Sequence, residues 1–413
     1  MKLKKLALLI AAAGISAPAF ATNGYFSHGY GMKAKGMAGV GIALPQDSLA
    51  TATNPAGITE IGNRLDVGLD VFMPRRGSEI VGNGAGLTGS YDGSGRANFF
   101  VPELGYNRML SKDMAFGIAV YGNGGMNTHY NRNPWGAFGG SNPAGVDLMQ
   151  VFVAPTFAIK PAPAHSFGVS LVFAHQQFGA SGLEPFAAMS ADPANLTGKG
   201  RDKSNGWGWR LGWTGKLADN VTLGATYASR MRMSKFDKYR GLFAEQGDFD
   251  IPENYGIGIA VKAAPKLTVA ADIQKINYGS VKSVANRLDL TTRLGNDNGS
   301  GFGWRDMTVF KLGASYEYSK DLTLRAGYSA GRQPIPASET YFNILAPGVM
   351  EKHLTLGATW TLANKSELTV AYMHAFKKQV NGSGSIPAVH GGGEANIRMY
   401  QNSIGVSYGI KFD

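Results

Sequence analysis

Apolar and polar residues alternate along most of this chain. In LTLRAGYSAG, from Leu322 to Gly331, every second residue from Leu322 to Tyr328 is apolar or aromatic, and the residues between them are polar or glycine. A period of two predicts a β-strand with one apolar face. The same phrase recurs as VTLGATYAS from Val221, LTVAADIQ from Leu267, LTLGATWTL from Leu354 and ELTVAYMH from Glu367.

The connections between these strands fall into two classes. Short polar turns at 111–113, 161–165, 218–220, 264–266, 319–321 and 364–366 alternate with long polar loops near 75–95, 127–145, 182–204, 237–252, 285–305, 336–351 and 383–394. Short turns at one end and long loops at the other are typical of an outer-membrane β-barrel. A soluble β-sandwich also has short alternating strands, but it needs neither an apolar face on every strand nor two classes of connection.

We therefore predict an all-β fold, a 14-stranded antiparallel transmembrane β-barrel. An even strand number returns the C-terminus to the periplasmic side. The expected strands begin near Arg64, Ala97, Met114, Val146, Phe167, Asn205, Val221, Glu253, Leu267, Met307, Leu322, Lys352, Glu367 and Ala395.

Residue parity separates the lipid face from the lumen. In the sixth strand, Trp207, Trp209, Leu211 and Trp213 are expected to face lipid. The fourth expected strand, VDLMQVFVAPTFAIK, is apolar on both faces, so its parity stays open. Charged residues expected in the lumen, most of them pairing across it, are Asp66, Asp70, Glu103, Arg210, Lys216, Arg230, Asp272, Lys311, Glu317 and Arg325.

Two segments precede the first strand. Residues 1–21 have three lysines, a short apolar run and Ala19-Phe20-Ala21, which predicts a signal peptide and export. Residues 22–63 are rich in small residues and show neither the period of two of a strand nor the period of 3.6 of a helix. We therefore expect a small helical plug, or hatch, inside the lumen of a barrel formed by residues 64–413. Within the plug, Asn54-Pro55-Ala56 predicts an extended residue and a turn that stops a helix before the first strand.

Composition and charge agree with an outer-membrane location. The chain has no cysteine, 57 glycines and a formal charge of +11, of which the three lysines of the signal segment contribute three. The remaining +8 predicts contact with outer-membrane lipid and lipopolysaccharide, or simply solvated loops, rather than nucleic acid, which an exported protein rarely meets.

No chemical motif competes with this interpretation. GAGLTG, from Gly84 to Gly89, fits a dinucleotide pattern but lies in an expected outer loop without a strand and helix around it. The seven histidines lack metal-ligand spacing. We expect no cofactor, no metal and no enzyme activity, although the sequence leaves open a catalytic group at His353 or His374, which lie near serines and acids.

Three stretches resemble the FadL family of outer-membrane transporters for long-chain fatty acids and hydrocarbons. They are GYFSHGYGMKAKGMAGVGIALPQDSLATATNPAGI from Gly24, GDFDIPENYGIGIA from Gly247 and YFNILAPGVMEKHLTLGATW from Tyr341. The resemblance covers the whole mature chain and implies a 14-stranded barrel, a hatch that carries the Asn54-Pro55-Ala56 element, and a kinked third strand with a lateral gap. The chain departs from the family at its end, where Asp413 follows Phe412, so the effect of that residue on assembly stays open.

The resemblance implies passive uptake of a hydrophobic compound by a monomer. The third expected strand carries Gly122-Asn123-Gly124-Gly125 where the lateral gap should lie, although an ordinary strand end fits these residues too. Tyr25 and Phe26 of the hatch are expected to line a lumen pocket. A carboxylate head would need a cation, for which Arg210, Lys311 and Arg325 are candidates by parity.

Apolar loop residues would capture the cargo first. Phe186, Met189, Leu242 and Phe243 are expected to be exposed on short amphipathic helices, or else to pack together as a loop core. Fatty acids, alkanes and aromatic hydrocarbons all suit an apolar pocket, so the cargo stays open. The alternatives are a general porin and a structural or adhesive barrel.

Overall fold

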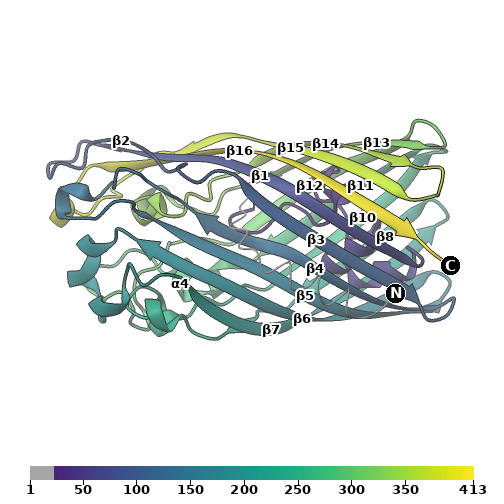
Figure 1. The fold of residues 1–413 in the computed structure, drawn as a ribbon, viewed down its shortest axis with the longest axis horizontal. Coiled ribbons are helices and arrows are strands. Elements are labelled where there is room, and N and C mark those ends of the chain that lie inside the picture. The colour runs from purple at the N-terminus through teal and green to yellow at the C-terminus, as the bar shows by residue number, and fades with distance from the viewer. Residues whose placement is uncertain (1–22) are drawn as a thin grey trace.

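The computed structural model describes residues 23–413, so the predicted signal peptide lies outside the described residues. Fourteen of the 16 strands form a closed antiparallel barrel (Figure 1). They are β1 Arg64–Val81, β3 Phe99–Met109, β4 Met114–Asn127, β5 Gly145–Ala162, β6 His165–Ser181, β7 Asp202–Ala218, β8 Val221–Ala228, β10 Asn254–Ala264, β11 Leu267–Ile276, β12 Met307–Glu317, β13 Leu322–Gly331, β14 Lys352–Thr361, β15 Glu367–Val380 and β16 Glu394–Lys411.

The barrel closes between its first and last strands. β16 pairs with β1 along the whole length of β1, from Arg64 opposite Lys411 to Val81 opposite Glu394. The expected strand number is confirmed, and the expected first residues lie within three positions of those observed. Short turns and the C-terminus share one end of the barrel, whereas the long loops gather at the other end (Figure 1). No helix within residues 23–413 is long and apolar enough to cross a membrane.

Membrane-facing and lumen-facing residues alternate as the period of two predicts. Trp207 and Leu211 are exposed on the outer surface of β7, and Arg210 between them is buried on the inner side. The fourth barrel strand, β5, whose parity stayed open, exposes Phe157 and Ile159 to the membrane and buries the even-numbered residues between and before them.

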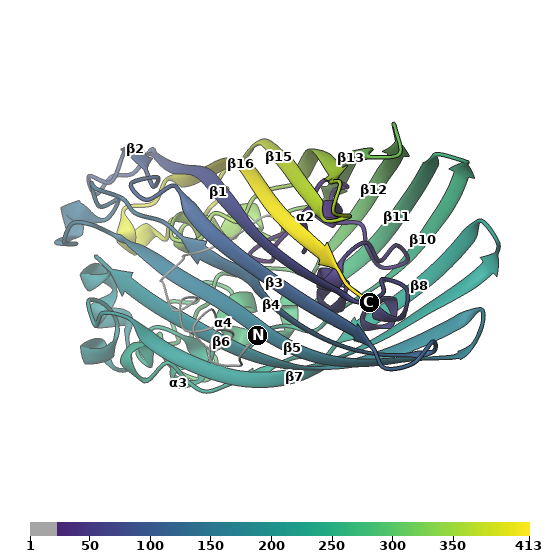
Figure 2. The same cartoon turned by 45° about the vertical axis from the view of Figure 1, so that its right-hand side comes forward.

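The segment from residue 23 to residue 63, which we call the hatch segment, lies inside the barrel (Figure 2). It contains three short helices: α2 Met32–Lys35 and the 3₁₀ helices η1 Ser48–Ala52 and η2 Pro55–Thr59. Glycines on nine barrel strands face this segment, and a Cβ built on any of them would press against hatch atoms: Gly105, Gly168, Gly212, Gly224, Gly258, Gly313, Gly327, Gly357 and Gly405. The hatch segment therefore docks closely because the wall lacks side chains where the two meet.

The long loops fold over the outer end of the barrel. Two short strands, β2 Gly89–Asp92 and β9 Arg232–Met233, pair with β1 and β7. β1 continues to Val81, so the first loop begins about seven residues later than the pattern predicts. The remaining helical turns are η3 Gly136–Phe138, η4 Glu184–Met189, η5 Pro193–Asn195, η6 Asp237–Tyr239, α3 Ala244–Gly247, η7 Tyr278–Ser280, α4 Lys282–Ala285, η8 Ala337–Glu339, η9 Phe342–Ile344 and η10 Ala388–His390.

Candidate functional site

Buried ion pairs join the hatch segment to the barrel wall. Lys33 of α2 lies 2.6 Å from the carboxylate of Glu367 on β15. Lys35 of the same helix lies 2.8 Å from Asp70 on β1 and 3.7 Å from Glu103 on β3. Asp70 and Glu103 were among the charges expected to pair across the lumen. Instead they pair with Lys35, because the hatch segment occupies that space.

Asp47 begins η1 within the same charged region. Its carboxylate accepts a hydrogen bond from the backbone N–H of Leu49 at 3.0 Å and caps the helix. Burial and the nearby Asp66 carboxylate raise the pKa of Asp47 to about 6. The hatch segment therefore contains a titratable group close to neutral pH.

The Asn54-Pro55-Ala56 element hydrogen-bonds the middle of the hatch segment to the barrel wall. Asn54 is extended, follows the end of η1 and caps η2. Its side-chain amide donates to the carbonyl of Ile42 at 2.7 Å and to that of Trp213 on β7 at 2.9 Å. The turn expected before the first strand thus separates two 3₁₀ helices and also binds the wall.

The three cations proposed for a ligand carboxylate contact the hatch segment instead. Arg210 donates to the carbonyl of Thr53 at 3.1 Å, and Lys311 donates to that of His28 at 3.0 Å. Arg325 donates to the side-chain carbonyl of Gln46 at 2.9 Å. Their positions inside the lumen agree with parity, but each of them donates at least one hydrogen bond to the hatch segment.

The backbone ladder between β3 and β4 is interrupted towards the outer end of β4. Their ladder stops at Leu104 opposite Val120, so residues 121–127 of β4 pair with β5 but have no partner on β3. The register of β4 shifts between Gly122 and Gly124, where the glycine-rich stretch predicts a break. Beyond this point the edge of β4 that faces β3 has no strand partner in the wall.

The start of the hatch segment fills that edge. Gly125 donates its N–H to the carbonyl of Tyr25 at 2.9 Å, and Ser27 donates its N–H to the carbonyl of Asn123 at 2.8 Å. Phe26 pairs with Gly124 in an antiparallel bridge. A Cβ on Gly124 would overlap the carbonyl of Tyr25, so this glycine admits the hatch backbone.

An aromatic cluster holds Tyr25 and Phe26 in place. The hydroxyl of Tyr278 accepts the backbone N–H groups of Tyr25 at 3.1 Å and Phe26 at 3.3 Å, and it donates to the carbonyl of Asn23. The rings of Tyr278 and Trp304 lie 5.1 Å and 6.0 Å from the ring of Tyr25.

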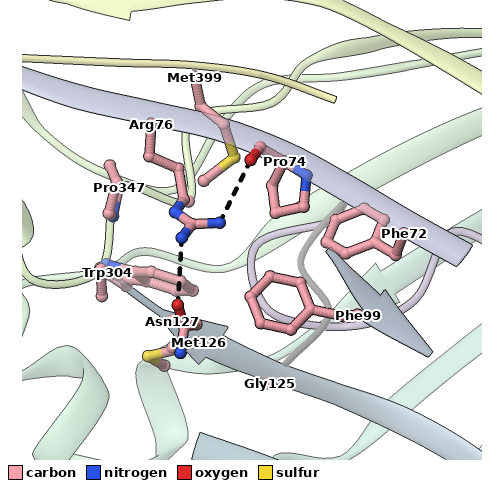
Figure 3. Close-up of a pocket in the computed structure, with 12 residues that line it drawn as sticks. Phe72, Pro74, Arg76, Phe99, Gly125, Met126, Asn127, Trp304, Pro347 and Met399 are labelled. Atoms are coloured by element: carbon pink, nitrogen blue, oxygen red, sulfur yellow. Dashed lines mark hydrogen bonds between the residues drawn. The ribbon is translucent and has the colours of Figure 1, made fainter. Parts of the chain in front are cut away.

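A small apolar pocket lies beside this cluster (Figure 3). Trp304 and Gly125 line it, so it touches both the aromatic cluster and the edge of β4. Its volume is about 20 Å³, enough for little more than one water molecule. The other lining residues with large side chains are Phe72, Arg76, Phe99, Met126, Asn127 and Met399.

Arg76 is the cation of this pocket, and sequence reasoning missed it. Its guanidinium donates to the side-chain carbonyl of Asn127 at 3.1 Å and lies 5.6 Å from the centre of the Phe99 ring. Its Nε has no hydrogen-bond partner, and no ion pair is recorded for it within residues 23–413. Asp70, Phe72 and Pro74 of β1 face inward, and the same alternation places Arg76 inward as well. This alternation could have revealed Arg76 from the sequence.

The residues expected to capture cargo form a loop core rather than an exposed patch. Phe186 packs edge-on against Trp135 and Phe342, and Phe243 lies 4.6 Å from the ring of Phe178. Both are buried, which agrees with the loop core and not with exposure among the two alternatives that the sequence left open. Met189 and Leu242 are half-buried against the same cluster. The aromatic rings cover one another because the long loops fold together.

No catalytic or metal centre is apparent in the part of the chain that the structure describes. His353 and His374 lie on opposite faces of the wall, the first buried in the lumen and the second facing outward, so they do not converge. Within residues 23–413, no three acidic or histidine side chains gather as metal ligands would.

The likeness to known proteins extends over the whole barrel. The family model described as "Outer membrane protein transport protein (OMPP1/FadL/TodX)" matches residues 8–412. The long-chain fatty acid transport protein of Escherichia coli O6:H1 is 23% identical over 439 residues, which cover 92% of this chain and 93% of that protein.

Solved structures agree in fold. A FadL homologue of Pseudomonas aeruginosa superposes with a TM-score of 0.73 at 18% identity, covering 94% of this chain and 100% of that one. The toluene transporter TodX of Pseudomonas putida gives a TM-score of 0.69 at 20% identity, with coverages of 93% and 99%. This chain therefore belongs to the FadL/TodX family, whose members are not enzymes but transport hydrophobic compounds across the outer membrane of Gram-negative bacteria.

Proposed function

We propose that the chain carries an apolar compound with a carboxylate head, such as a long-chain fatty acid, passively from the outer surface to a lateral exit between β3 and β4. The observation that carries this proposal is the position of Tyr25–Ser27, which closes the free edge of β4 directly beside the apolar pocket. The relative from Escherichia coli, named as a long-chain fatty acid transport protein, supports the same cargo class.

Movement of the hatch segment connects the pocket to the exit. Trp304 and Gly125 belong both to the pocket and to the contacts that hold Tyr25. A ligand that displaces Trp304 loosens the aromatic cluster and releases the edge of β4. The exposed backbone groups of that edge then line a cavity, where non-helical and unpaired backbone is tolerated at membrane depth.

The pocket must enlarge before cargo binds. Met126 and Met399 line it, and methionine side chains repack easily because they are unbranched and flexible. We propose that the half-exposed surface at Met189 and Leu242 passes cargo inward from the loops. The barrel strands pair with their neighbours, and Tyr25–Ser27 covers the one interrupted edge, on β4, so the described barrel leaves no strand edge for a second copy, which supports a monomer.

Arg76 supports a carboxylate-bearing cargo. Its buried guanidinium donates to Asn127 and to the carbonyls of Pro74, Gly93 and Arg96, yet within residues 23–413 its Nε keeps no partner in a pocket whose lining is mostly apolar. In Arg76→Gln, binding of oleate to the detergent-solubilised protein should weaken by roughly tenfold, since a charge-assisted hydrogen bond contributes about 1.5–3 kcal/mol. Binding of toluene should stay unchanged. Arg76→Lys should recover part of the oleate affinity. Equal loss for both ligands would show that Arg76 only shapes the pocket, and cargo with a carboxylate head would then lack its support.

Uptake into proteoliposomes separates this proposal from a general porin. Without any energy source, the protein should accelerate entry of labelled oleate relative to empty liposomes and leave entry of sucrose unchanged. A porin would accelerate both, because an open lumen does not select by polarity. Equal acceleration of the sugar would therefore exclude selective uptake.

A further inference from the structure

Basic side chains follow the membrane-facing surface of adjacent strands at their outer ends. Arg75 of β1 has the same parity as Val67 and Leu69, which are exposed to the membrane. Arg398 of β16 shares the parity of the exposed Tyr400 and Ile404. The outer ends of the next strands along the wall add three exposed cations: Lys377 on β15, Lys352 on β14 and Arg332 directly after β13.

These cations lie at the height of lipid headgroups. Arg75 is 11 residues from the periplasmic start of β1 at Arg64. With a rise of about 3.3 Å per residue and a strand tilt of about 40°, this distance corresponds to about 28 Å across the membrane, just above an apolar band that is about 25 Å tall. On each strand the outward face changes there from apolar or aromatic residues to a basic one.

Three of the cations surround one pocket on the outer surface. Arg75, Lys377 and Arg398 line a volume of about 370 Å³ together with Tyr400 and Ser94. Arg75 lies directly across the β1–β16 ladder from Tyr400. The pocket has one carboxylate in its lining, that of Asp92, and it also reaches Arg76 and Met399 from the lumen side.

The three cations lack acidic partners. Within residues 23–413, no ion pair is recorded for Arg75, Lys377 or Arg398; Arg398 donates only to the hydroxyl of Ser90, at 3.1 Å.

Some basic residues elsewhere on the outer surface are paired. Arg201 and Arg96 lie 2.6 Å and 3.8 Å from Asp147, and Lys275 lies 3.3 Å from Asp306. The face formed by β13 to β16 and β1 differs because its cations lie side by side on adjacent strands and three of them line one pocket.

We propose that this pocket binds a phosphate group of the phosphorylated glycolipid of the outer leaflet, lipopolysaccharide. The guanidinium groups of Arg75 and Arg398 match phosphate oxygens in pairs, and Lys377 adds a point charge. Tyr400 and the apolar residues below it then contact the acyl chains, as aromatic residues do at membrane interfaces. This inference does not depend on the proposed cargo or exit.

The test uses the mature protein in detergent and measures bound lipid by native mass spectrometry. Bisphosphorylated lipid A is compared with dephosphorylated lipid A that carries the same acyl chains. The variant Arg75→Gln/Lys377→Gln/Arg398→Gln removes the pocket cations. The matched control Lys203→Gln/Arg232→Gln/Lys235→Gln removes three exposed cations at β7 and β9, on strands away from β1 and β16. Heat-modifiable gel mobility verifies that each barrel is folded.

The wild type and the control should prefer the phosphorylated lipid, and added salt should reduce that preference. The pocket variant should bind it roughly a hundredfold more weakly, since each basic residue near an anionic surface contributes about a fivefold gain in affinity. Equal binding of both lipids by the wild type would overturn the proposal, even if the pocket variant failed to fold. Full affinity in a folded pocket variant would overturn it as well. Displacement of the lipid by millimolar inorganic phosphate would assign the pocket to free phosphate instead.

Discussion

At single positions, the absence of a side chain decides where the hatch segment docks. Gly168 of β6 faces inward, and a Cβ there would overlap the backbone of Pro55. A backbone cannot rotate away as a flexible side chain can, so a larger residue at this position must displace η2. The recurring glycine in phrases such as LTLGATW reflects this requirement.

Gly168→Val should therefore raise ion conductance in planar bilayers while the barrel still folds. The expected increase is severalfold, because η2 closes part of the lumen only while it lies against the wall. Gly179→Val is the matched control on the outward side of the same strand, where the nearest atom to a new Cβ lies 3.5 Å away. If both variants conduct like the wild type, the close approach of η2 is not needed for closure.

Asp47 makes docking of the hatch segment depend on pH. Its pKa rises from 3.8 to about 6 upon burial, so the docked state favours the protonated carboxyl. The resulting stabilisation is complete below about pH 4 and is lost as the pH rises through 6. One pKa unit corresponds to about 1.4 kcal/mol, so at neutral pH the charged carboxylate of Asp47 destabilises the docked state by about 2–3 kcal/mol.

Asp47→Asn keeps the helix cap but removes this titration. At pH 7.5 the amides of Ser48–Ala52 should gain protection from hydrogen exchange relative to the wild type, after correction for intrinsic rates. At pH 4 the two proteins should be equally protected. Lower protection of the variant at pH 7.5 would mean that the charged carboxylate stabilises docking through Lys33 and Arg64.

At the scale of elements, β4 and the start of the hatch segment form one paired unit, in which Tyr25–Ser27 covers the edge of β4. The sequence located the break through Gly122-Asn123-Gly124-Gly125, because glycine-rich stretches weaken pairing locally. It did not reveal that Tyr25–Ser27 pairs there, since a contact between residues a hundred positions apart leaves no periodic signal. Substituting valine at Gly124 would expel Tyr25 rather than fill an opening.

The Tyr278→Phe variant should weaken the pairing between β4 and the start of the hatch segment without changing its geometry. The variant keeps the ring but loses the hydroxyl that binds Asn23, Tyr25 and Phe26. The amides of Asn123–Gly125 should exchange about tenfold faster, because a lost hydrogen bond contributes about 1–1.5 kcal/mol. Residues 115–120 of β4, which keep their partners on β3, serve as the internal reference. Unchanged exchange would show that Tyr278 does not hold the segment.

For the whole molecule, alternation and the two classes of connection predicted the barrel and its strand number, because both patterns are local in the sequence. The position of the hatch segment and the role of Arg76 depend on which residues meet in space. Arg210, Lys311 and Arg325 were correctly placed inside the lumen, yet parity could not show that the hatch segment uses them. Arg76 was missed because β1 continues into what looked like a loop.

Two routes out of the lumen follow from this architecture. One is lateral, at the edge of β4. The other leads straight down past a pocket of about 230 Å³ between the hatch segment and the periplasmic turns, lined by Leu44, Pro45 and Pro163. Engineered cysteine cross-links distinguish them, because the chain has no cysteine of its own.

The pair Ser27→Cys and Asn123→Cys joins antiparallel neighbours, so a disulfide can lock the hatch segment to β4. The pair Glu60→Cys and Lys160→Cys, bridged by a short bismaleimide, locks the hatch segment at the periplasmic rim, where the native side chains lie 2.7 Å apart. The decisive measurement is oleate uptake by proteoliposomes that contain each locked protein. The first lock should reduce uptake to the level of empty liposomes until reductant restores it, and the second should leave it unchanged. Full uptake with the first lock and none with the second would contradict lateral release and assign the exit to the periplasm.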